Sequence, residues 1–164
     1  VLIPGPLTGC SLADSITGKD VEELREQNPD YTFVCYINTT ADVKAACDVC
    51  VTSGNVMHIV ETIPSDKIFF VPDALMGQNI IDEMKRRGVK KDIKLYNGCC
   101  YVHENYDPDL IQFFRSQNPN LKVISHPECN PSVAMLSDYV GSTGQMVSYI
   151  NQQPKDSCIL LLTE

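Results

Sequence analysis

The sequence lacks any long apolar run and any excess of positive charge. No stretch approaches the ~20 consecutive apolar residues that a membrane-spanning helix needs, and no charged-then-apolar leader opens the chain. The 13 lysine and arginine residues face 21 aspartate and glutamate residues, a net charge of −8, which argues against a protein that tracks nucleic-acid phosphates. Apolar residues make up 43% of the chain, a globular composition. We therefore expect a soluble, cytoplasmic protein with neither a membrane nor a nucleic-acid partner.

An initiator methionine is also missing. The chain opens at Val1 inside an apolar, strand-like run, and it stops at Glu164, shortly after the apolar run Ile159–Leu162. We therefore expect these 164 residues to be a piece of a longer protein.

A second C-x-x-C pair is missing as well. Of the eight cysteines, only Cys47 and Cys50 have this spacing, whereas a zinc ribbon needs two such pairs. Without a secretion signal, the even count does not predict disulfides. Cys35 and Cys158 lie in apolar runs, where a free cysteine packs as a small hydrophobic residue. The cysteine count therefore gives only weak support to a zinc site.

Short apolar runs alternate with helical patterns along the whole chain. In Asp73–Arg87, apolar residues recur every three or four positions, as they do in an amphipathic helix. The predicted strands are Val1–Pro4, Thr32–Ile37, Lys67–Val71, Ile93–Tyr96, Leu121–Ser125 and Cys158–Leu162. The predicted helices are Asp20–Gln27, Ala41–Cys47, Asn55–Glu61, Ala74–Arg87, Pro108–Gln117, Ser132–Leu136 and Thr143–Asn151. This alternation predicts an α/β fold with parallel sheets.

The chain repeats itself, without a gap, at a distance of 90 residues. Arg25–Pro29 falls on Arg115–Pro119, and predicted strands coincide under the same shift. Further superposed pairs are Cys10 with Cys100, Asp48 with Asp138, Gly54 with Gly144, and Lys67–Val71 with Ser157–Leu161. We predict two tandem, related three-layer α/β/α units, residues 1–88 and 89–164. The second unit has no counterpart of the helix at Ala74–Arg87, so we expect it to be truncated at its C-terminal end.

Ligand sites of open parallel sheets lie beyond the carboxyl ends of the strands, and both units place polar residues there. These are Cys10 and Cys100 after the first strands, Tyr36, Asn38, His126 and Glu128 after the second, and Thr52–Gly54 and Ser142–Gly144 after the third. A hydroxyl before a glycine at a helix start favours phosphate or oxyanion binding, because free N–H groups and the helix dipole face the anion. The alternative is that Ser53 and Thr143 only cap their helices.

The segment His126–Cys129 brings an imidazole, a carboxylate and a thiol together. Strand alternation puts His126 and Glu128 on one side, where they can hold a substrate and move a proton. The alternative is a surface loop with an incidental carboxylate. Cys129 aligns with Thr39, so the repeat does not support it as a metal ligand.

Cys10 and Cys100 are the only cysteines that the repeat superposes on each other. A thiolate at a helix N-terminus has a lowered pKa, as metal ligation requires, so the two can meet at one metal or cluster. Two thiolates are too few for zinc or an ordinary cluster without further ligands, and the alternative is two unrelated buried cysteines.

Six motifs in one order resemble the quinolinate synthase family over the whole chain. They are Gly9–Asp14, Tyr36–Lys44, Thr52–Asn55, Gly98–Glu104, His126–Cys129 and Asp138–Thr143. The resemblance implies a three-unit, pseudo-threefold architecture of which this chain is the middle and most of the last unit. It also implies an enzyme that condenses iminoaspartate with dihydroxyacetone phosphate to quinolinate in NAD biosynthesis, in functional coupling with an enzyme that makes iminoaspartate.

The same resemblance implies roles for individual residues. It assigns Cys10 and Cys100 to a [4Fe–4S] cluster, a Lewis acid for dehydration, whose third cysteine would lie beyond Glu164. It assigns catalysis to Glu128, His126 and Tyr36. The residues that it places around substrate are Tyr36, Asn38, Ser53, His126, Glu128, Ser142 and Thr143, and it gives His103 a supporting position.

Two departures from the family pattern stand out. Gly5 follows Pro4 where the family often has aspartate, and Val51 stands where the family sometimes has a thiol. With the first unit and the end of the third missing, we expect this fragment alone to be inactive. The rival hypotheses are a cluster-free α/β module that binds a small phosphorylated or dicarboxylate ligand, and a degenerate relative that binds neither ligand nor metal.

Overall fold

The computed structural model describes residues 9–164, so the strand predicted over Val1–Pro4 lies outside the described residues. The elements are η1 (Ala13–Ser15), α1 (Gly18–Gln27), β1 (Thr32–Tyr36), α2 (Ala41–Ala46), β2 (Val49–Val51), α3 (Val56–Thr62), β3 (Lys67–Val71), α4 (Ala74–Arg86), β4 (Asp92–Leu95), α5 (Tyr101–Glu104), α6 (Pro108–Gln117), β5 (Lys122–Ser125), α7 (Pro131–Leu136), β6 (Tyr139–Val140), α8 (Thr143–Asn151) and β7 (Ile159–Leu162). In this part of the chain, no helix combines the length and the apolar character of a membrane span.

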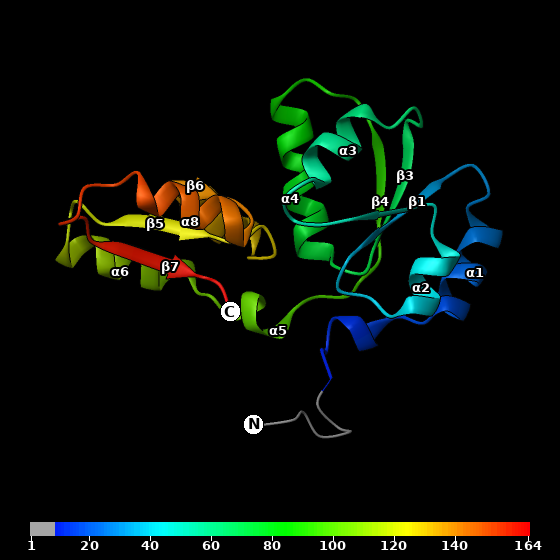
Figure 1. Cartoon of the computed structure of the whole chain (residues 1–164), viewed down its shortest axis with the longest axis horizontal. Helices are drawn as coiled ribbons and strands as arrows, with labels where there is room; N and C mark the ends of the chain where they lie inside the picture. Colours follow the sequence, from blue (N-terminus) through cyan, green and yellow to red (C-terminus); the bar gives the residue numbers. More distant parts are fainter. Residues whose placement is uncertain (1–8) are drawn as a thin grey trace.

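Two separate sheets form, and every strand pair in them is parallel. The first sheet has the order β2-β1-β3-β4, and the second has the order β6-β5-β7. Figure 1 shows the two sheets side by side, with α5 below the gap between them. The predicted α/β class with parallel sheets is confirmed.

The first sheet is covered by helices on both faces. Along β1, Val34 and Tyr36 face the core under α3 and α4, whereas Phe33 and Cys35 face the core under α1 and α2. This alternation follows from the two-residue period of a strand. A strand that is buried on both faces reads as a continuous apolar run, which is why β1 and β3 were predictable.

Four short elements were not predicted, one of them the three-residue 3₁₀ helix η1. The strands β2 and β6 have three and two residues, and α5 has four, too few for a periodic signal. The strand β4 pairs with β3 and so completes the first sheet. The division into residues 1–88 and 89–164 stays a prediction.

The repeat is visible in the structure as well as in the sequence. The helices α1 and α6, and likewise α2 and α7, are offset by 90 residues. The ungapped shift is wrong at the last strand, however. Thr32 pairs with Ile68, whereas Lys122 pairs with Ile159 rather than Cys158, so the second unit carries one extra residue before β7.

The same partly exposed ion pair recurs in both units. Asp138 accepts a hydrogen bond from the Val123 N–H at 2.8 Å and contacts Arg115 at 3.0 Å. Asp48 contacts the Phe33 N–H and Arg25 in the same way, at 2.7 Å and 2.6 Å. Each aspartate thus ties the strand β1 or β5 to the preceding helix, because its carboxylate satisfies one group from each.

We predict that Asp138→Ala lowers the free energy of unfolding by about 1–3 kcal/mol, because the buried Val123 N–H loses its acceptor. Burial opposes ionisation of Asp138, but the Val123 N–H and Arg115 hold its pKa below the ordinary value. The drop in the free energy of unfolding caused by Asp138→Ala should therefore be full at neutral pH and should shrink as pH falls below about 4. Urea denaturation measures it, and Asp156→Ala, at an exposed loop position, is the matched control. Equal losses in both variants would contradict the role of the pair.

Candidate active site

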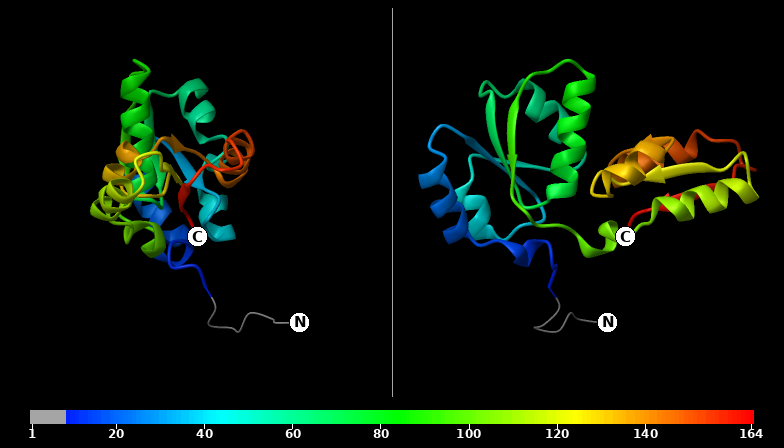
Figure 2. Two further views of the ribbon diagram at one scale, coloured as in Figure 1. Left: turned by 90° about the vertical axis from the view of Figure 1, so that its left-hand side faces the viewer. Right: turned by 180° about the vertical axis from the view of Figure 1, so that it is seen from behind.

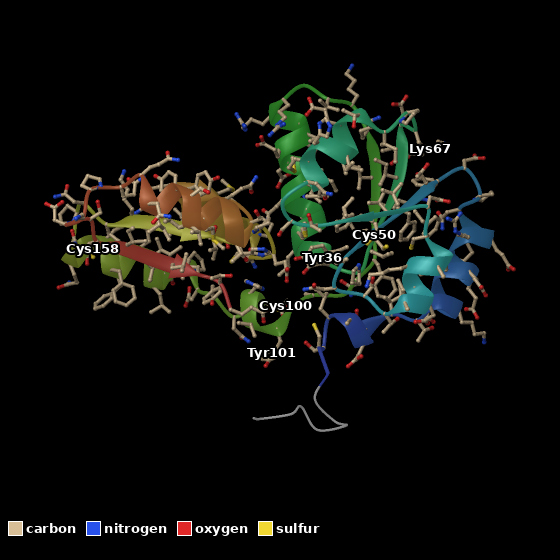
Figure 3. All side chains as sticks on the ribbon, viewed as in Figure 1. Tyr36, Cys50, Lys67, Cys100, Tyr101 and Cys158 are labelled. Carbon is tan, nitrogen blue, oxygen red and sulfur yellow. The ribbon has the colours of Figure 1, made fainter. Side chains whose placement is uncertain are left out.

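The candidate site lies where β1 of the first sheet and β5 of the second both end. Figure 3 shows Tyr36 and Cys100 near each other in this region, whereas Cys158 lies at the far end of the second sheet. The views of Figures 1 and 2 agree that the C-terminal end of the chain comes next to α5, where the Tyr106 hydroxyl donates to the Thr163 carbonyl at 2.7 Å. Residues far apart in sequence are thus brought to one place.

A buried carboxylate, that of Glu128, is at the centre of the site. Its side chain is 2% exposed. The Tyr36 hydroxyl donates to Oε1 at 2.7 Å, and His103 Nδ1 lies 3.2 Å from Oε2. His126 Nδ1 lies 3.5 Å from Oε1. The two imidazoles stack on each other with their centroids 5.1 Å apart. The structure therefore brings together the three residues with predicted catalytic roles and adds His103 to them.

The loop that carries Glu128 is held from both units. The His126 N–H donates to the Leu162 carbonyl at 3.0 Å, which continues the pairing of β5 with β7. From α4 of the first unit, the Asn79 amide donates to the Pro127 and Cys129 carbonyls, each at 2.8 Å. Sequence reasoning missed Asn79, since nothing in a helical pattern shows which loop a half-buried amide will reach.

Burial and hydrogen bonding set the protonation states of these groups. Burial opposes ionisation of Glu128, but its contacts with His103 and Tyr36 hold its pKa below the ordinary value, so the carboxylate is ionised at pH 7. Burial lowers the pKa of His126 to about 4, although the negative charge of Glu128 acts to raise it. Burial and the Glu128 charge raise the pKa of Tyr36. A neutral imidazole next to an ionised carboxylate can exchange a proton with a ligand.

Asp73 is a second buried carboxyl group that sequence reasoning missed. Its Oδ1 accepts from the Met76 N–H at 2.8 Å and caps α4, while Oδ2 is buried with no hydrogen-bond partner among the described residues. Burial raises its pKa to about 7. The adjoining Ala74 N–H donates to the Gly98 carbonyl at 2.7 Å, which fixes the chain just before Cys100. An aspartate after a proline at a helix start was the available signal.

The two hydroxyl-rich turns face each other across the units. A Cβ atom added to Gly54 would lie 3.5 Å from Ser142 Oγ. A cavity of about 540 Å³ adjoins the turns and is lined by Ser53, Gly54, Asn79 and Gly141, among others. Tyr36 and Glu128 do not line it, so the cavity borders the buried carboxylate site rather than containing it.

The capping alternative is wrong for the residues it named. Asn55, not Ser53, precedes α3, and its Oδ1 accepts from the Thr52 N–H at 2.7 Å. Ser142, not Thr143, caps α8, in a reciprocal capping box with Gln145. Ser53 therefore lies outside α3, and Thr143 is the first residue of α8, so neither is the capping residue. Their substrate contacts, like that of half-buried Asn38, stay predictions.

Of the two cysteines predicted to hold a cluster, Cys100 is buried and belongs to the site. It precedes α5 directly, and its thiol lies with His103 and Glu128 in a group whose ligand atoms are all within 4.8 Å of one another. Burial raises the pKa of Cys100. Cys10 is exposed and is not in this group, and its ligand role stays a prediction. Only one thiol of the described donor set therefore meets the cluster's need for cysteine ligands.

The other cysteines lie in different surroundings. Cys129 is buried, donates to the Leu162 carbonyl at 3.5 Å, and has a pKa raised by burial to about 12. Cys50 pairs in register with Cys35 on the neighbouring strand, and Cys47 packs beside Cys35 in the core under α1 and α2. The C-x-x-C pair is therefore on the face of the sheet opposite Tyr36.

Comparison with known proteins identifies the class of protein. The family model described as Quinolinate synthetase A protein matches residues 1–164. The chain is 40% identical over 164 residues to a quinolinate synthase of Sinorhizobium medicae, covering 100% of the chain and 44% of that protein. It is 42% identical over 160 residues to a quinolinate synthase of Caldicellulosiruptor bescii, covering 98% of the chain and 52% of that protein. It is 43% identical over 149 residues to a quinolinate synthase of Aquifex aeolicus, covering 91% of the chain and 45% of that protein.

The chain is thus part of an enzyme family. It belongs to the quinolinate synthase family. It spans about half the length of the curated relatives that it matches.

We predict that Tyr36→Phe lowers the free energy of unfolding by about 1.5–3 kcal/mol, because the buried Glu128 carboxylate loses a hydrogen-bond donor. It should also raise the pKa of Glu128, which NMR of ¹³C-labelled glutamate measures. Tyr101→Phe is the matched control, since Tyr101 is 62% exposed. An unchanged Glu128 titration in Tyr36→Phe would show that this hydrogen bond does not stabilise the charge.

We predict that the His126 ring stays neutral down to about pH 4 in the folded protein. An unfolded histidine takes up its proton near pH 6.5, so this residue makes the folded state lose stability as pH falls from about 6.5 to 4. Ring ¹⁵N shifts recorded against pH test this, with the exposed His58 as the internal reference. Protonation of both rings over the same pH range would be incompatible with the buried, neutral imidazole.

Proposed function

We propose that the chain forms the middle and most of the last unit of a pseudo-threefold quinolinate synthase, which makes quinolinate for de novo NAD biosynthesis. The intact enzyme would condense iminoaspartate with dihydroxyacetone phosphate. Elemental balance then requires two molecules of water and one of phosphate to leave, so the site must remove protons and help hydroxyl groups depart. The 164-residue chain alone is expected to be inactive.

The single observation that supports this proposal most is the buried, ionised Glu128 between Tyr36 and two imidazoles. Glu128 would take a proton from a carbon next to a carbonyl or imine group, because its carboxylate is ionised at pH 7. The neutral His126 would take up or return a proton at its ring nitrogen. Tyr36 would donate its hydroxyl hydrogen to a substrate oxygen when that oxygen displaces Glu128 from it.

The remaining residues would bind and orient the substrates. Asn38, two residues after β1, would hold a carboxylate or hydroxyl group, and Ser53, which lines the cavity, would position substrate. Ser142 and Thr143 would bind the phosphate end at the start of α8, where backbone N–H groups point outward. An iminoaspartate-forming enzyme would act in functional coupling with this one.

A [4Fe–4S] cluster would be held by Cys10, Cys100 and a cysteine outside this chain. When bound, it would supply a Lewis-acid iron for the dehydration steps. The family membership supports this cofactor, while the donor set around Cys100 supplies only one of its thiolates.

We predict that, in the intact enzyme, Cys10→Ser and Cys100→Ser each abolish the cluster, because each removes a thiolate ligand. Anaerobic iron and sulfide analysis measures this, and Cys158→Ser, at an exposed cysteine far from the site, should keep both elements. Normal iron in either ligand variant would refute the assignment and favour the cluster-free binding module.

We predict that Glu128→Gln leaves the cluster intact but lowers turnover by at least about 100-fold, the scale of a lost general base. Quinolinate formation is the measurement, and iron content is the control. Turnover at the wild-type rate would remove Glu128 from the proposed proton transfer.

A further inference from the structure

Three thiols of the first unit lie together on the sheet face under α1 and α2, outside the candidate active site. Cys35 is buried in β1, and Cys50 is its register partner on β2. Register partners on parallel strands point to the same face of the sheet, so these two side chains are neighbours. Cys47, which ends α2, packs in the same core as Cys35. Cys35 is therefore flanked by one thiol on β2 and by another at the end of α2.

Backbone hydrogen bonds fix the position of Cys47 beside β1. The Cys47 N–H donates to the Lys44 carbonyl at 3.3 Å, where α2 ends. The Asp48 N–H donates to the Phe33 carbonyl at 2.9 Å, and the Asp48 carboxylate accepts from the Phe33 N–H at 2.7 Å. Phe33 and Cys35 are two residues apart in one strand and so share a face. Cys47 is thus held next to the face of β1 that carries Cys35.

The equivalent positions in the second unit show how close two such side chains come. Ser125 and Ser137 lie 90 residues after Cys35 and Cys47. The same hydrogen bonds between strand and aspartate hold Ser137 beside β5. The Ser137 hydroxyl donates to the Ser125 hydroxyl at 2.8 Å. The scaffold therefore brings side chains at these two positions into direct contact, as a disulfide requires.

The surroundings favour Cys47 as the attacking thiol. Arg25 donates to the Ala46 carbonyl at 2.8 Å and contacts Asp48 at 2.6 Å, so a positive charge lies next to Cys47. Contact with the Cys35 thiol lowers the pKa of Cys47, and the Arg25 charge acts in the same direction, against burial. Contact with Cys47 raises the pKa of Cys35, as does burial. Because the thiolate is the nucleophile, half-buried Cys47 should react before fully buried Cys35.

Geometry separates this pair from the two other pairings of the three thiols. A disulfide needs its two Cβ atoms about 3.5–4.5 Å apart. Cys35 and Cys50 lie directly opposite each other on parallel strands, whose spacing of about 4.8 Å keeps the Cβ atoms too far apart. Cys47 and Cys50 have C-x-x-C spacing but lie in different elements, and the thiol that each one contacts is that of Cys35. The pair best placed for a bond is Cys35 with Cys47.

We propose that Cys35 and Cys47 form a reversible disulfide by exchange with a low-molecular-weight disulfide such as oxidised glutathione. The Cys47 thiolate attacks one sulfur of the reagent, forms a mixed disulfide and releases the first reagent thiol. Cys35 then attacks the Cys47 sulfur and releases the second. Two protein thiols are thus oxidised, one reagent disulfide is reduced, and the two protein protons pass to the two reagent thiols. The site goes beyond the proposed function, in which neither cysteine has a role.

The test treats the reduced 164-residue chain with excess oxidised glutathione and then blocks the remaining thiols with N-ethylmaleimide. Proteolytic cleavage before aspartate puts each thiol in its own peptide, residues 30–41, 42–47 and 48–65. Mass spectrometry should find 30–41 joined to 42–47, while 48–65 carries one maleimide. A bond from 48–65 to either of the other peptides, or maleimide on all three, would overturn the proposal.

Serine variants test the order of attack. Cys35→Ser and Cys47→Ser each introduce the residue found at the equivalent position of the second unit, so both should fold, which circular dichroism checks. In Cys35→Ser the mixed disulfide cannot be resolved, so peptide 42–47 should retain glutathione. Glutathione on 48–65 and none on 42–47 would contradict the attack by Cys47.

Cys50→Ser is the matched control, because it removes the third thiol of the group and leaves the proposed pair intact. It should form the same disulfide as the wild-type chain. Loss of the disulfide in this variant would show that the C-x-x-C pair carries the exchange instead, which would overturn the proposal.

The outcome is separable from that of the proposed function. Cys47→Ser removes neither a proposed cluster ligand nor a proposed substrate contact, so iron content and quinolinate formation in the intact enzyme should match those of the wild type. Failure of the disulfide would therefore count against this proposal alone.

Discussion

The buried charge of Glu128 is the constraint on which the site depends. An ionised carboxylate loses several kcal/mol of hydration when it is buried, so it persists only where donors surround it. Here the donor to Oε1, Tyr36, comes from the end of β1 in the first sheet, while Glu128 follows β5 in the second. The two sheets must therefore stand at one distance and angle for the carboxylate to remain paired. This contact therefore links the buried carboxylate to the arrangement of the two sheets.

The repeat explains why such a contact can form. Tyr36 and His126 occupy equivalent positions, 90 residues apart, at the ends of the central strands of the two sheets. Parallel sheets present these ends at one edge, and two related units can point that edge toward each other. Each unit then supplies a different side chain at the same structural position. Equivalent places in the two halves thus carry different side chains, which makes the site asymmetric.

Much of this arrangement could be predicted from the sequence. The other features left no local pattern in the sequence, for physical reasons. The long apolar runs of β1 and β3 and the periodicity of α4 are strong local signals, and the repeat indicated which strand ends were equivalent. The strands β2 and β6 are too short to have a pattern, because their stability comes from pairing with β1 and β5. The single-residue slip before β7 depends on pairing register, which scattered identities in a loop do not reveal.

The site shows the same division between local and long-range information. Tyr36, His126 and Glu128 were identifiable because they follow apolar strands. The positions of His103, Asp73 and Asn79 depend on contacts between segments far apart in the chain. The sequence offered a family resemblance for His103 and a proline–aspartate helix start for Asp73, but no signal for the loop that Asn79 reaches. Cys10 and Cys100 are equivalent in the repeat, yet one is exposed and the other buried, so equivalence of position does not imply equivalence of environment.

The Asn79 amide has a mechanical consequence. Its two hydrogen bonds to the Pro127 and Cys129 carbonyls attach the Glu128 loop to the middle of α4, a rigid helix of the other unit. A rotation of one sheet relative to the other would therefore pull on the loop from both ends at once. The carboxylate therefore moves with α4 as well as with its own strand. The Asn79 amide is one route, beside the Tyr36–Glu128 hydrogen bond, by which the two units transmit displacement to each other. A hinge between them would have to break that attachment before it could open.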